Sequence, residues 1–184
     1  MNHHDMTRNM VLAALFAALT AIGAFLQIPT GTVPITLQFL FTALAGLLLG
    51  GKWGAISQLL YVGIGLLGLP VFTQGGGIGY VLQPSFGFLL GLIPAAAVIG
   101  ALTARRTGYL TVLAAVLVGD LILYAVGVPY MYLILHVYMQ SAKTFSALLA
   151  AMLVYVPGDT LKIIVVTALA PVLRRTLAKA VPNL

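Results

Sequence analysis

The chain has 184 residues, of which 61% are hydrophobic and only 7% are charged. A mean hydropathy of +1.11 and recurring apolar runs of roughly 20 residues exclude an ordinary soluble domain and indicate one integral membrane domain over residues 1–184. The net charge of +6 comes without the polar, aromatic-rich surface that nucleic-acid binding needs, and the absence of cysteine excludes disulfides and thiolate metal sites.

Breaks at glycine, proline and charged residues predict an all-α membrane protein with six transmembrane helices. In chain order they are expected at 9–28, 34–50, 53–69, 84–104, 108–127 and 159–177. Long loops follow the third and fifth helices, at 70–83 and 128–157. The apolar part of the second loop, "FSALLAAMLVYV", is itself long enough for a short helix.

The basic residues predict how these helices are oriented, because lysine and arginine favour cytoplasmic loops. With a cytoplasmic N-terminus, only Lys143 falls outside the cell. Inside it fall Arg8, Lys52, Arg105, Arg106, Arg174, Arg175 and Lys179. We therefore expect both termini in the cytoplasm and both long loops outside it.

The first predicted helix carries small side chains on one arc and large apolar ones on the other. The small arc contains Ala13, Ala14, Ala17, Ala18 and Ala21. Small residues four positions apart let another helix approach closely in lipid. Two interpretations are open: this arc packs inside the protein's own bundle, or it docks a partner subunit.

The glycine-rich stretch "VFTQGGGIGYVLQPSFGF" (71–88) is the first candidate lining of a binding site. Gly75 and Gly77 expose backbone groups and permit close approach to a ligand, while Tyr80 and Gln83 offer stacking and amide contacts. The alternative is a merely flexible loop. A phosphate-binding loop is excluded, because the Lys-Ser/Thr ending is missing and no strand is predicted before it.

Asp120 and Tyr124 lie one turn apart in the fifth predicted helix. They face either the same cavity as the other polar residues or a hydrogen-bonded bundle interior. Gln38 is expected to bridge helices, with a possible contact to ligand. No Ser–His–Asp order, H-E-x-x-H motif or paired carboxylates for hydrolysis occur in the sequence, so we expect no enzyme.

Two opposite charges stand at the start of the sixth predicted helix, in "VYVPGDTLKIIVVTALAP" (154–171). Pro157 and Gly158 should break an arriving helix and begin a new one, which the Asp159 carboxylate could cap. Lys162 follows three residues later, on nearly the same face. A lone ion at membrane depth costs about 2.5–3.5 kcal/mol, so both side chains should face the bundle interior or a cavity. A structural ion pair and a small-molecule site are both open.

Three stretches together resemble the BioY family, the biotin-binding S components of energy-coupling-factor vitamin transporters. They are "GLLGLPVFTQGGGIGYVLQPSFGFLLGLIPAA" (65–96), which contains the glycine-rich stretch, "LILYAVGVPYMYL" (121–133) and "VPGDTLKIIVVTALA" (156–170). The family's P-G-D-x-x-K pattern falls on Pro157, Gly158, Asp159 and Lys162. The resemblance implies that Asp159 and Lys162 contact biotin and that the glycine-rich stretch lines or closes the pocket.

The same resemblance implies partners and a location. The protein would sit in a bacterial or archaeal cell membrane, capture biotin from outside, and dock through helix 1 on a transmembrane T component bound to two cytosolic ATPases. It would use no cofactor, because ATP is consumed only by the partners. The rival interpretations are an S component for another water-soluble vitamin, an intramembrane enzyme using Asp159, Asp120 or His136, and an autonomous channel or carrier.

Overall fold

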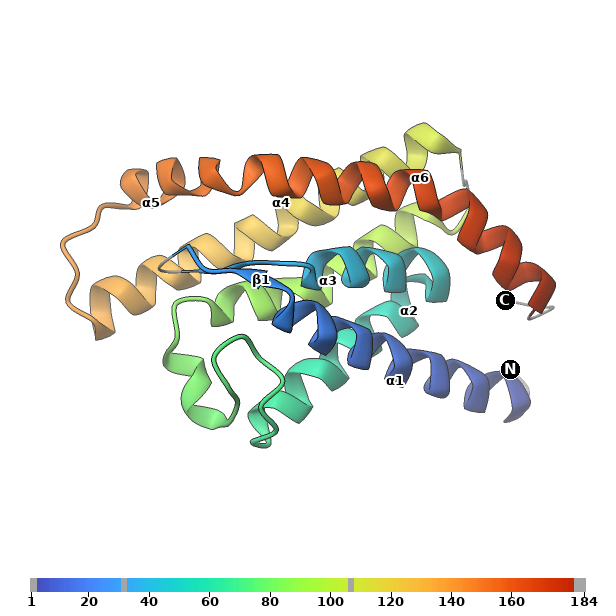
Figure 1. The fold of residues 1–184 in the computed structure, drawn as a ribbon, viewed down its shortest axis with the longest axis horizontal. Helices are drawn as coiled ribbons and strands as arrows, with labels where there is room; N and C mark the ends of the chain where they lie inside the picture. The colour runs from blue at the N-terminus through green and yellow to red at the C-terminus, as the bar shows by residue number, and fades with distance from the viewer. Residues whose placement is uncertain (1–2, 31–32, 106–107, 181–184) are drawn as a thin grey trace.

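Helices make up most of the chain (Figure 1), and the computed structural model describes residues 3–30, 33–105 and 108–180. Within these ranges, five helical segments are long and apolar enough to cross a membrane. The elements in chain order are α1 (His3–Phe25), β1 (Gln27–Ile28), β2 (Ile35–Thr36), α2 (Gln38–Leu66), η1 (Ile78–Leu82), α3 (Phe86–Thr103), α4 (Tyr109–Leu133), η2 (Ile134–Tyr138), α5 (Phe145–Ala151), η3 (Met152–Val154) and α6 (Val156–Ala180).

The long element α2 is two helices joined by a sharp reversal. Gly50 has φ +79° and ψ 170°, a conformation that interrupts the helix and that glycine adopts most readily. Beyond it the chain folds back so closely that a Cβ on Gly54 would lie 2.8 Å from the Gly46 Cα atom. The two halves correspond to the predicted helices 34–50 and 53–69. The prediction of six helices is therefore confirmed.

Two element boundaries differ from the prediction. The second helix begins at Gln38 rather than 34, because β2 pairs antiparallel with β1 in a short hairpin. The predicted loop 128–157 is largely helical. Helix α4 continues through Pro129, because membrane helices tolerate a proline within them, and η2 extends the helix to Tyr138. The short helix expected in the second half of this segment is present as α5 and η3.

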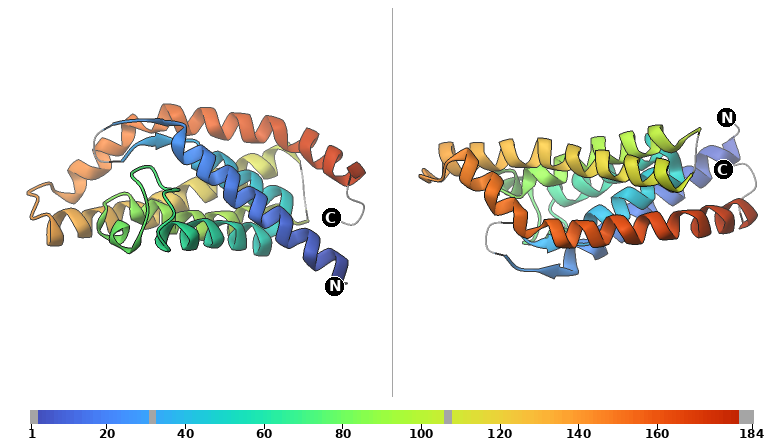
Figure 2. Two further views of the ribbon diagram at one scale, coloured as in Figure 1. Left: turned by 60° about the horizontal axis from the view of Figure 1, so that its bottom comes forward. Right: turned by 90° about the horizontal axis from the view of Figure 1, so that it is seen from above.

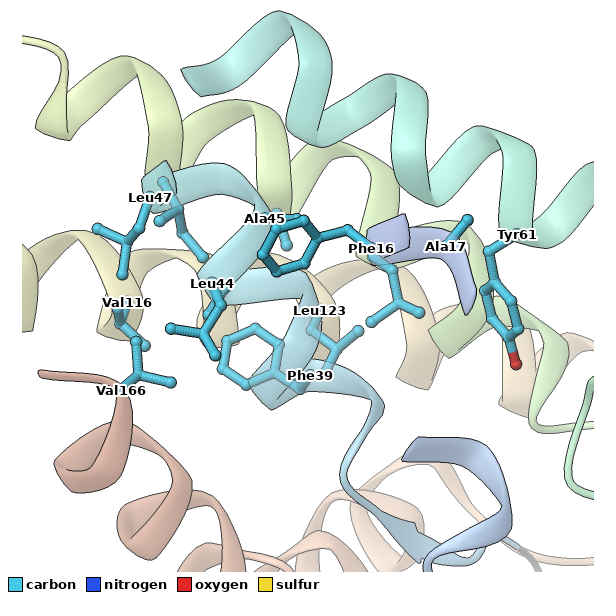
Figure 3. Close-up of a cluster of buried hydrophobic side chains, with 14 of the residues drawn as sticks. Phe16, Ala17, Phe39, Leu44, Ala45, Leu47, Tyr61, Val116, Leu123 and Val166 are labelled. Atoms are coloured by element: carbon cyan, nitrogen blue, oxygen red, sulfur yellow. The ribbon is translucent and has the colours of Figure 1, made fainter. Parts of the chain in front are cut away.

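The helices pack through small residues and a continuous apolar core. A Cβ on Gly100 of α3 would lie 2.2 Å from the Gly51 backbone nitrogen, so the backbones of α2 and α3 are nearly in contact. Around this contact the core is filled by side chains such as Phe39, Val116 and Val166, drawn from α2, α4 and α6 (Figure 3). The core thus ties both halves of the chain together.

Helix α6 lies along one side of the bundle, against α4 and α2 (Figures 1 and 2). Its two faces differ in character. Leu161 and Ile164 are exposed on the outer face, as expected for lipid contact, whereas Asp159 and Lys162 are buried on the inner face. The first and last helices begin and end at the same end of the bundle, which six crossings require (Figure 2).

The alanine arc of α1 is divided between two environments. Ala13 and Ala17 are buried against the protein's own bundle, so the docking prediction does not hold for these two residues. Ala14 and Ala18 are exposed, and Ala21 is half-buried. A partner would therefore meet a narrower strip than the sequence alone indicates.

Candidate ligand-binding cavity

A cavity of about 70 Å³ lies between the helices, close to the β1–β2 hairpin and the start of α6. Its walls come from the β1–β2 hairpin, the start of α2, the glycine-rich loop, α3, α4 and the start of α6. They combine aromatic and aliphatic side chains with a few polar groups. The lining residues are Val33, Pro34, Ile35, Thr36, Gln38, Phe39, Thr73, Tyr80, Ser85, Phe88, Leu89, Leu92, Leu123, Tyr124, Met152, Tyr155, Asp159 and Lys162.

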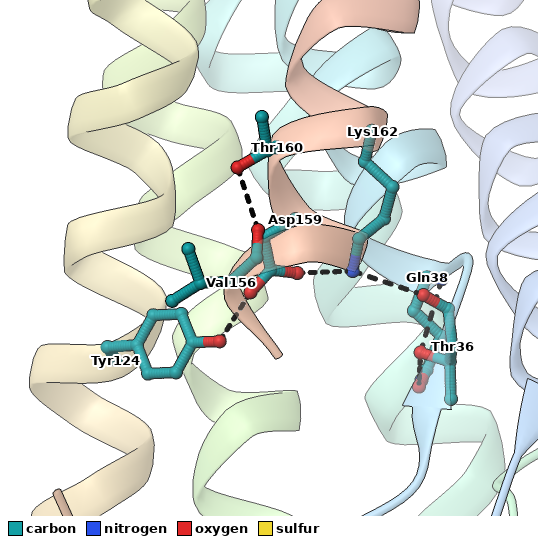
Figure 4. Close-up of polar contacts among 7 residues, drawn as sticks. All are labelled: Thr36, Gln38, Tyr124, Val156, Asp159, Thr160 and Lys162. Atoms are coloured by element: carbon teal, nitrogen blue, oxygen red, sulfur yellow. Dashed lines mark hydrogen bonds and ion pairs between the residues drawn. The ribbon is translucent and has the colours of Figure 1, made fainter. Parts of the chain in front are cut away.

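The charged groups of this cavity form a buried network (Figure 4). The Lys162 Nζ atom lies 2.6 Å from Asp159 Oδ1 and donates a second hydrogen bond to the Thr36 carbonyl oxygen at 3.3 Å. Tyr124 donates its hydroxyl hydrogen to the other carboxylate oxygen of Asp159. Asp159 and Lys162 are only 6% and 8% exposed, so each charge depends on these partners for solvation.

The start of α6 fixes this geometry. Pro157 lies in the first turn, where its missing N–H costs no helical hydrogen bond, and the Asp159 amide donates to the Tyr155 carbonyl at 2.9 Å. The helix therefore begins one residue before the expected break. The Asp159 carboxylate contacts Tyr124 and Lys162 rather than capping the helix.

A second polar chain continues from the hairpin into α2. Thr36 Oγ1 donates to the Gln38 side-chain oxygen at 2.9 Å, and the Gln38 amide nitrogen donates to the Tyr61 hydroxyl at 2.8 Å. Tyr61 in turn donates to the Val71 carbonyl oxygen at 3.0 Å. Gln38 thus bridges helices, as expected, while also lining the cavity.

Tyr80 reaches the cavity from the short helix η1 in the glycine-rich loop. Its hydroxyl lies 2.8 Å from Thr73 Oγ1 and 3.4 Å from Ser85 Oγ. Its ring packs on Phe72, at 4.6 Å between the ring centroids. The loop therefore forms a packed wall, in which Tyr80 is held by both polar and aromatic contacts.

Three other predicted residues of this loop do not line the cavity. Gly75 and Gly77 have φ of +109° and +98°, so they shape the loop through a backbone conformation that favours glycine. The Gly77 amide donates to the Gly65 carbonyl at 2.7 Å, which fastens the loop to the end of α2. Gln83 belongs to the turn before α3. What the structure shows for Gly75 and Gly77 is a role in shaping the loop, and direct ligand contact by these three residues stays a prediction.

Asp120 is also absent from the cavity walls. It lies one helical turn before Tyr124 in α4, and its Oδ1 atom is buried without a hydrogen-bond partner among the described residues. The structure thus shows neither the expected hydrogen bond of Asp120 Oδ1 nor a place for Asp120 among the lining residues, whereas Tyr124 one turn later does line the cavity.

The sequence prediction missed several lining residues, above all those of the hairpin. The stretch 29–36 contains a Pro-Thr-Gly-Thr turn signal that could have argued against a helix starting at 34. Tyr155 was missed too, although it directly precedes the first turn of α6. It donates its hydroxyl hydrogen to the Val33 carbonyl oxygen, so it holds the hairpin over the cavity.

The cavity can accept a small molecule that is apolar over most of its length and polar at one end. Phe39, Phe88 and Leu92 supply the apolar walls, and the Asp159–Lys162 pair supplies adjacent acceptor and donor groups. Fold and cavity together define a multi-pass membrane protein that holds a small ligand between its helices.

Comparison with known proteins shows which family of membrane proteins the chain belongs to. The BioY family model matches residues 1–179, and the chain belongs to the BioY family. A biotin transporter of Rhodobacter capsulatus is 39% identical over 188 residues, covering 97% of both chains. A probable biotin transporter of Lysinibacillus sphaericus is 53% identical over 142 residues, covering 76% of this chain and 72% of its own.

A solved structure supports the same assignment. The S component for biotin from an ECF-type ABC transporter superposes with a TM-score of 0.83 at 30% identity, covering 95% of each chain. The family consists of transport components rather than enzymes. The family assignment therefore argues against an intramembrane enzyme.

Proposed function

We propose that this protein takes up biotin as the substrate-capturing S component of an energy-coupling-factor transporter. The observation that carries the proposal is the buried Asp159–Lys162 pair beside an apolar cavity, in a chain of the BioY family. Biotin's ureido ring has two N–H donors and one carbonyl acceptor. The Asp159 carboxylate would accept from the ring, and the Lys162 ammonium would donate to it.

The remaining cavity groups would orient the ligand. Tyr124 holds the Asp159 carboxylate from the side opposite Lys162, so the carboxylate is fixed before the ligand arrives. Gln38 and Tyr80 are tied to neighbouring groups and would add polar contacts at the rim. The aromatic and aliphatic walls would cover the apolar bicycle of biotin.

Energy for uptake would come from partners, since the sequence contains no nucleotide-binding motif. In this proposal a T component docks on the exposed strip of α1, formed by Ala14, Ala18 and the half-buried Ala21, and carries two cytosolic ATPase subunits. The termini would face the cytoplasm of a bacterial or archaeal cell, with the cavity toward the outside.

Displacement of labelled biotin from the purified protein tests the ligand. We expect unlabelled biotin to compete and other water-soluble vitamins to fail. Saturable binding of another labelled vitamin, with none of labelled biotin, would move the protein to a different S-component specificity. Failure of every vitamin to bind would reject the proposed function.

Co-purification tests the partner. Ala14→Leu should abolish recovery of the T component while leaving biotin binding unchanged, because a larger side chain blocks close helix approach. Ile22→Leu is the matched control, since Ile22 is 52% exposed on the same helix and the substitution conserves volume. Equal recovery with both variants would place the docking surface elsewhere.

A further inference from the structure

A second cavity, of about 310 Å³, adjoins the first at the α5 end of the molecule. Two side chains, those of Met152 and Tyr155, line both cavities, so the cavities meet at these residues. Besides these two, the outer cavity is lined mostly by apolar side chains such as Met131 and Leu148, together with Lys143.

Among the described residues that line the outer cavity, Lys143 alone is charged. The Lys143 side chain is exposed. The ion pairs among the described residues are Asp5–Arg8 and Asp159–Lys162, so no described carboxylate pairs with the Lys143 ammonium group. Its ammonium is thus available to an anion that enters from outside the bundle.

The inner cavity offers little to a negatively charged group. Its cation, Lys162, lies 2.6 Å from Asp159, so the two charges nearly cancel, and the carboxylate would repel a second anion. An elongated ligand with its polar ring at Asp159 would extend past Met152 and Tyr155.

We infer that Lys143 binds the carboxylate of the ligand, with the ureido ring at Asp159 and Lys162 and the alkyl chain passing along Met152 and Tyr155. The inference rests on the proposed function, and it adds a specificity determinant at the outer end of the site. Met152 and Tyr155, placed where the two cavities meet and between two polar ends, match an alkyl chain that joins a ring to a carboxylate. Neutral analogues would lose only the outer contact.

The test compares biotin with biotin amide, which keeps the ring and chain but lacks the negative charge. Lys143→Ala should weaken biotin binding about two- to fivefold, as expected for an exposed charge pair. The same variant should bind biotin amide as the unaltered protein does. Lys143→Arg should retain the preference for biotin. Lys52→Ala is the control, since Lys52 is an exposed lysine in the other half of the bundle.

Salt gives a second readout that needs no variant. At about 1 M salt, where the screening length falls to about 3 Å, the unaltered protein should lose most of its preference for biotin over the amide. An unchanged preference in Lys143→Ala, or equal weakening of both ligands, would overturn the inference. Failure of the unaltered protein to bind either ligand would instead reject the proposed function itself.

Discussion

Replacing Asp159 by alanine should destabilise the protein strongly, because it leaves a buried ammonium group with little solvation. Lys162 is 8% exposed and would keep only the Thr36 carbonyl at 3.3 Å. Removing one partner of such a buried pair costs about 3–5 kcal/mol. The Tyr124 hydroxyl would also lose its acceptor. Removing both charges, in Asp159→Ala with Lys162→Ala, should recover most of this loss.

The chain contains a matched control for this experiment. Asp5 and Arg8 form an ion pair with the same three-residue spacing, at 3.3 Å, with side chains 35% and 25% exposed. Asp5→Ala should therefore cost less than about 1 kcal/mol. Thermal unfolding of the purified variants in detergent, followed by circular dichroism, measures the difference between the buried and the exposed pair.

Biotin separates a binding role from a purely structural one. At about 100 times its Kd, a ligand stabilises the folded state by about 2.7 kcal/mol, so the unaltered protein should unfold at a higher Tm with biotin present. Losing one charge-assisted hydrogen bond of about 1.5–3 kcal/mol weakens binding roughly 10- to 150-fold. The double variant should fold, but it loses at least two such bonds, so its affinity should fall at least about 100-fold and the same biotin concentration should stabilise it by no more than about 0.4 kcal/mol. Full protection of the double variant would refute the assignment of these residues to the ligand.

Two further substitutions test the packing at the other end of the bundle by the same unfolding assay. Arg174 donates to the Leu47 and Thr103 carbonyl oxygens near the ends of two helices, and the shortest of these bonds is 2.7 Å. Arg174→Gln should lower the free energy of unfolding by about 2–3 kcal/mol, because these carbonyls lose their charged donors. Unchanged stability would show that water replaces the lost donors. Gly100→Ala should lower the free energy of unfolding by about 1–3 kcal/mol, because the added methyl group overlaps the backbone of α2. Gly63→Ala is the control: its added methyl group meets open space, so this substitution should be neutral or stabilising.

The helices could be predicted from the sequence because a segment that crosses a membrane needs a long apolar run, and glycines, prolines and charged residues mark where each run ends. It also predicted that Asp159 and Lys162 face the bundle interior or a cavity, because charged side chains at membrane depth are costly and need partners. The hairpin was missed because its strands are two residues each, too short for any periodic pattern. The continuation of α4 through Pro129 depends on packing that a sequence does not reveal.

Other site predictions were incomplete for a shared reason. Gly75 and Gly77 do have a special role, since their positive φ angles shape the turn. The alanines of α1 form one small arc on a helical wheel, yet the wheel cannot tell which edge meets the protein's own bundle. Ala17 is covered by α2 while Ala18 is exposed. Residue type indicated the chemistry, and only the tertiary arrangement decided where it is used.

Calorimetric titration of the purified protein with biotin measures whether Asp159 and Lys162 hold the ligand. We expect saturable heat with one biotin per chain for the unaltered protein, and no heat under the same conditions for the folded variant lacking both Asp159 and Lys162. Absence of heat with the unaltered protein, or equal heat with that variant, would contradict this expectation.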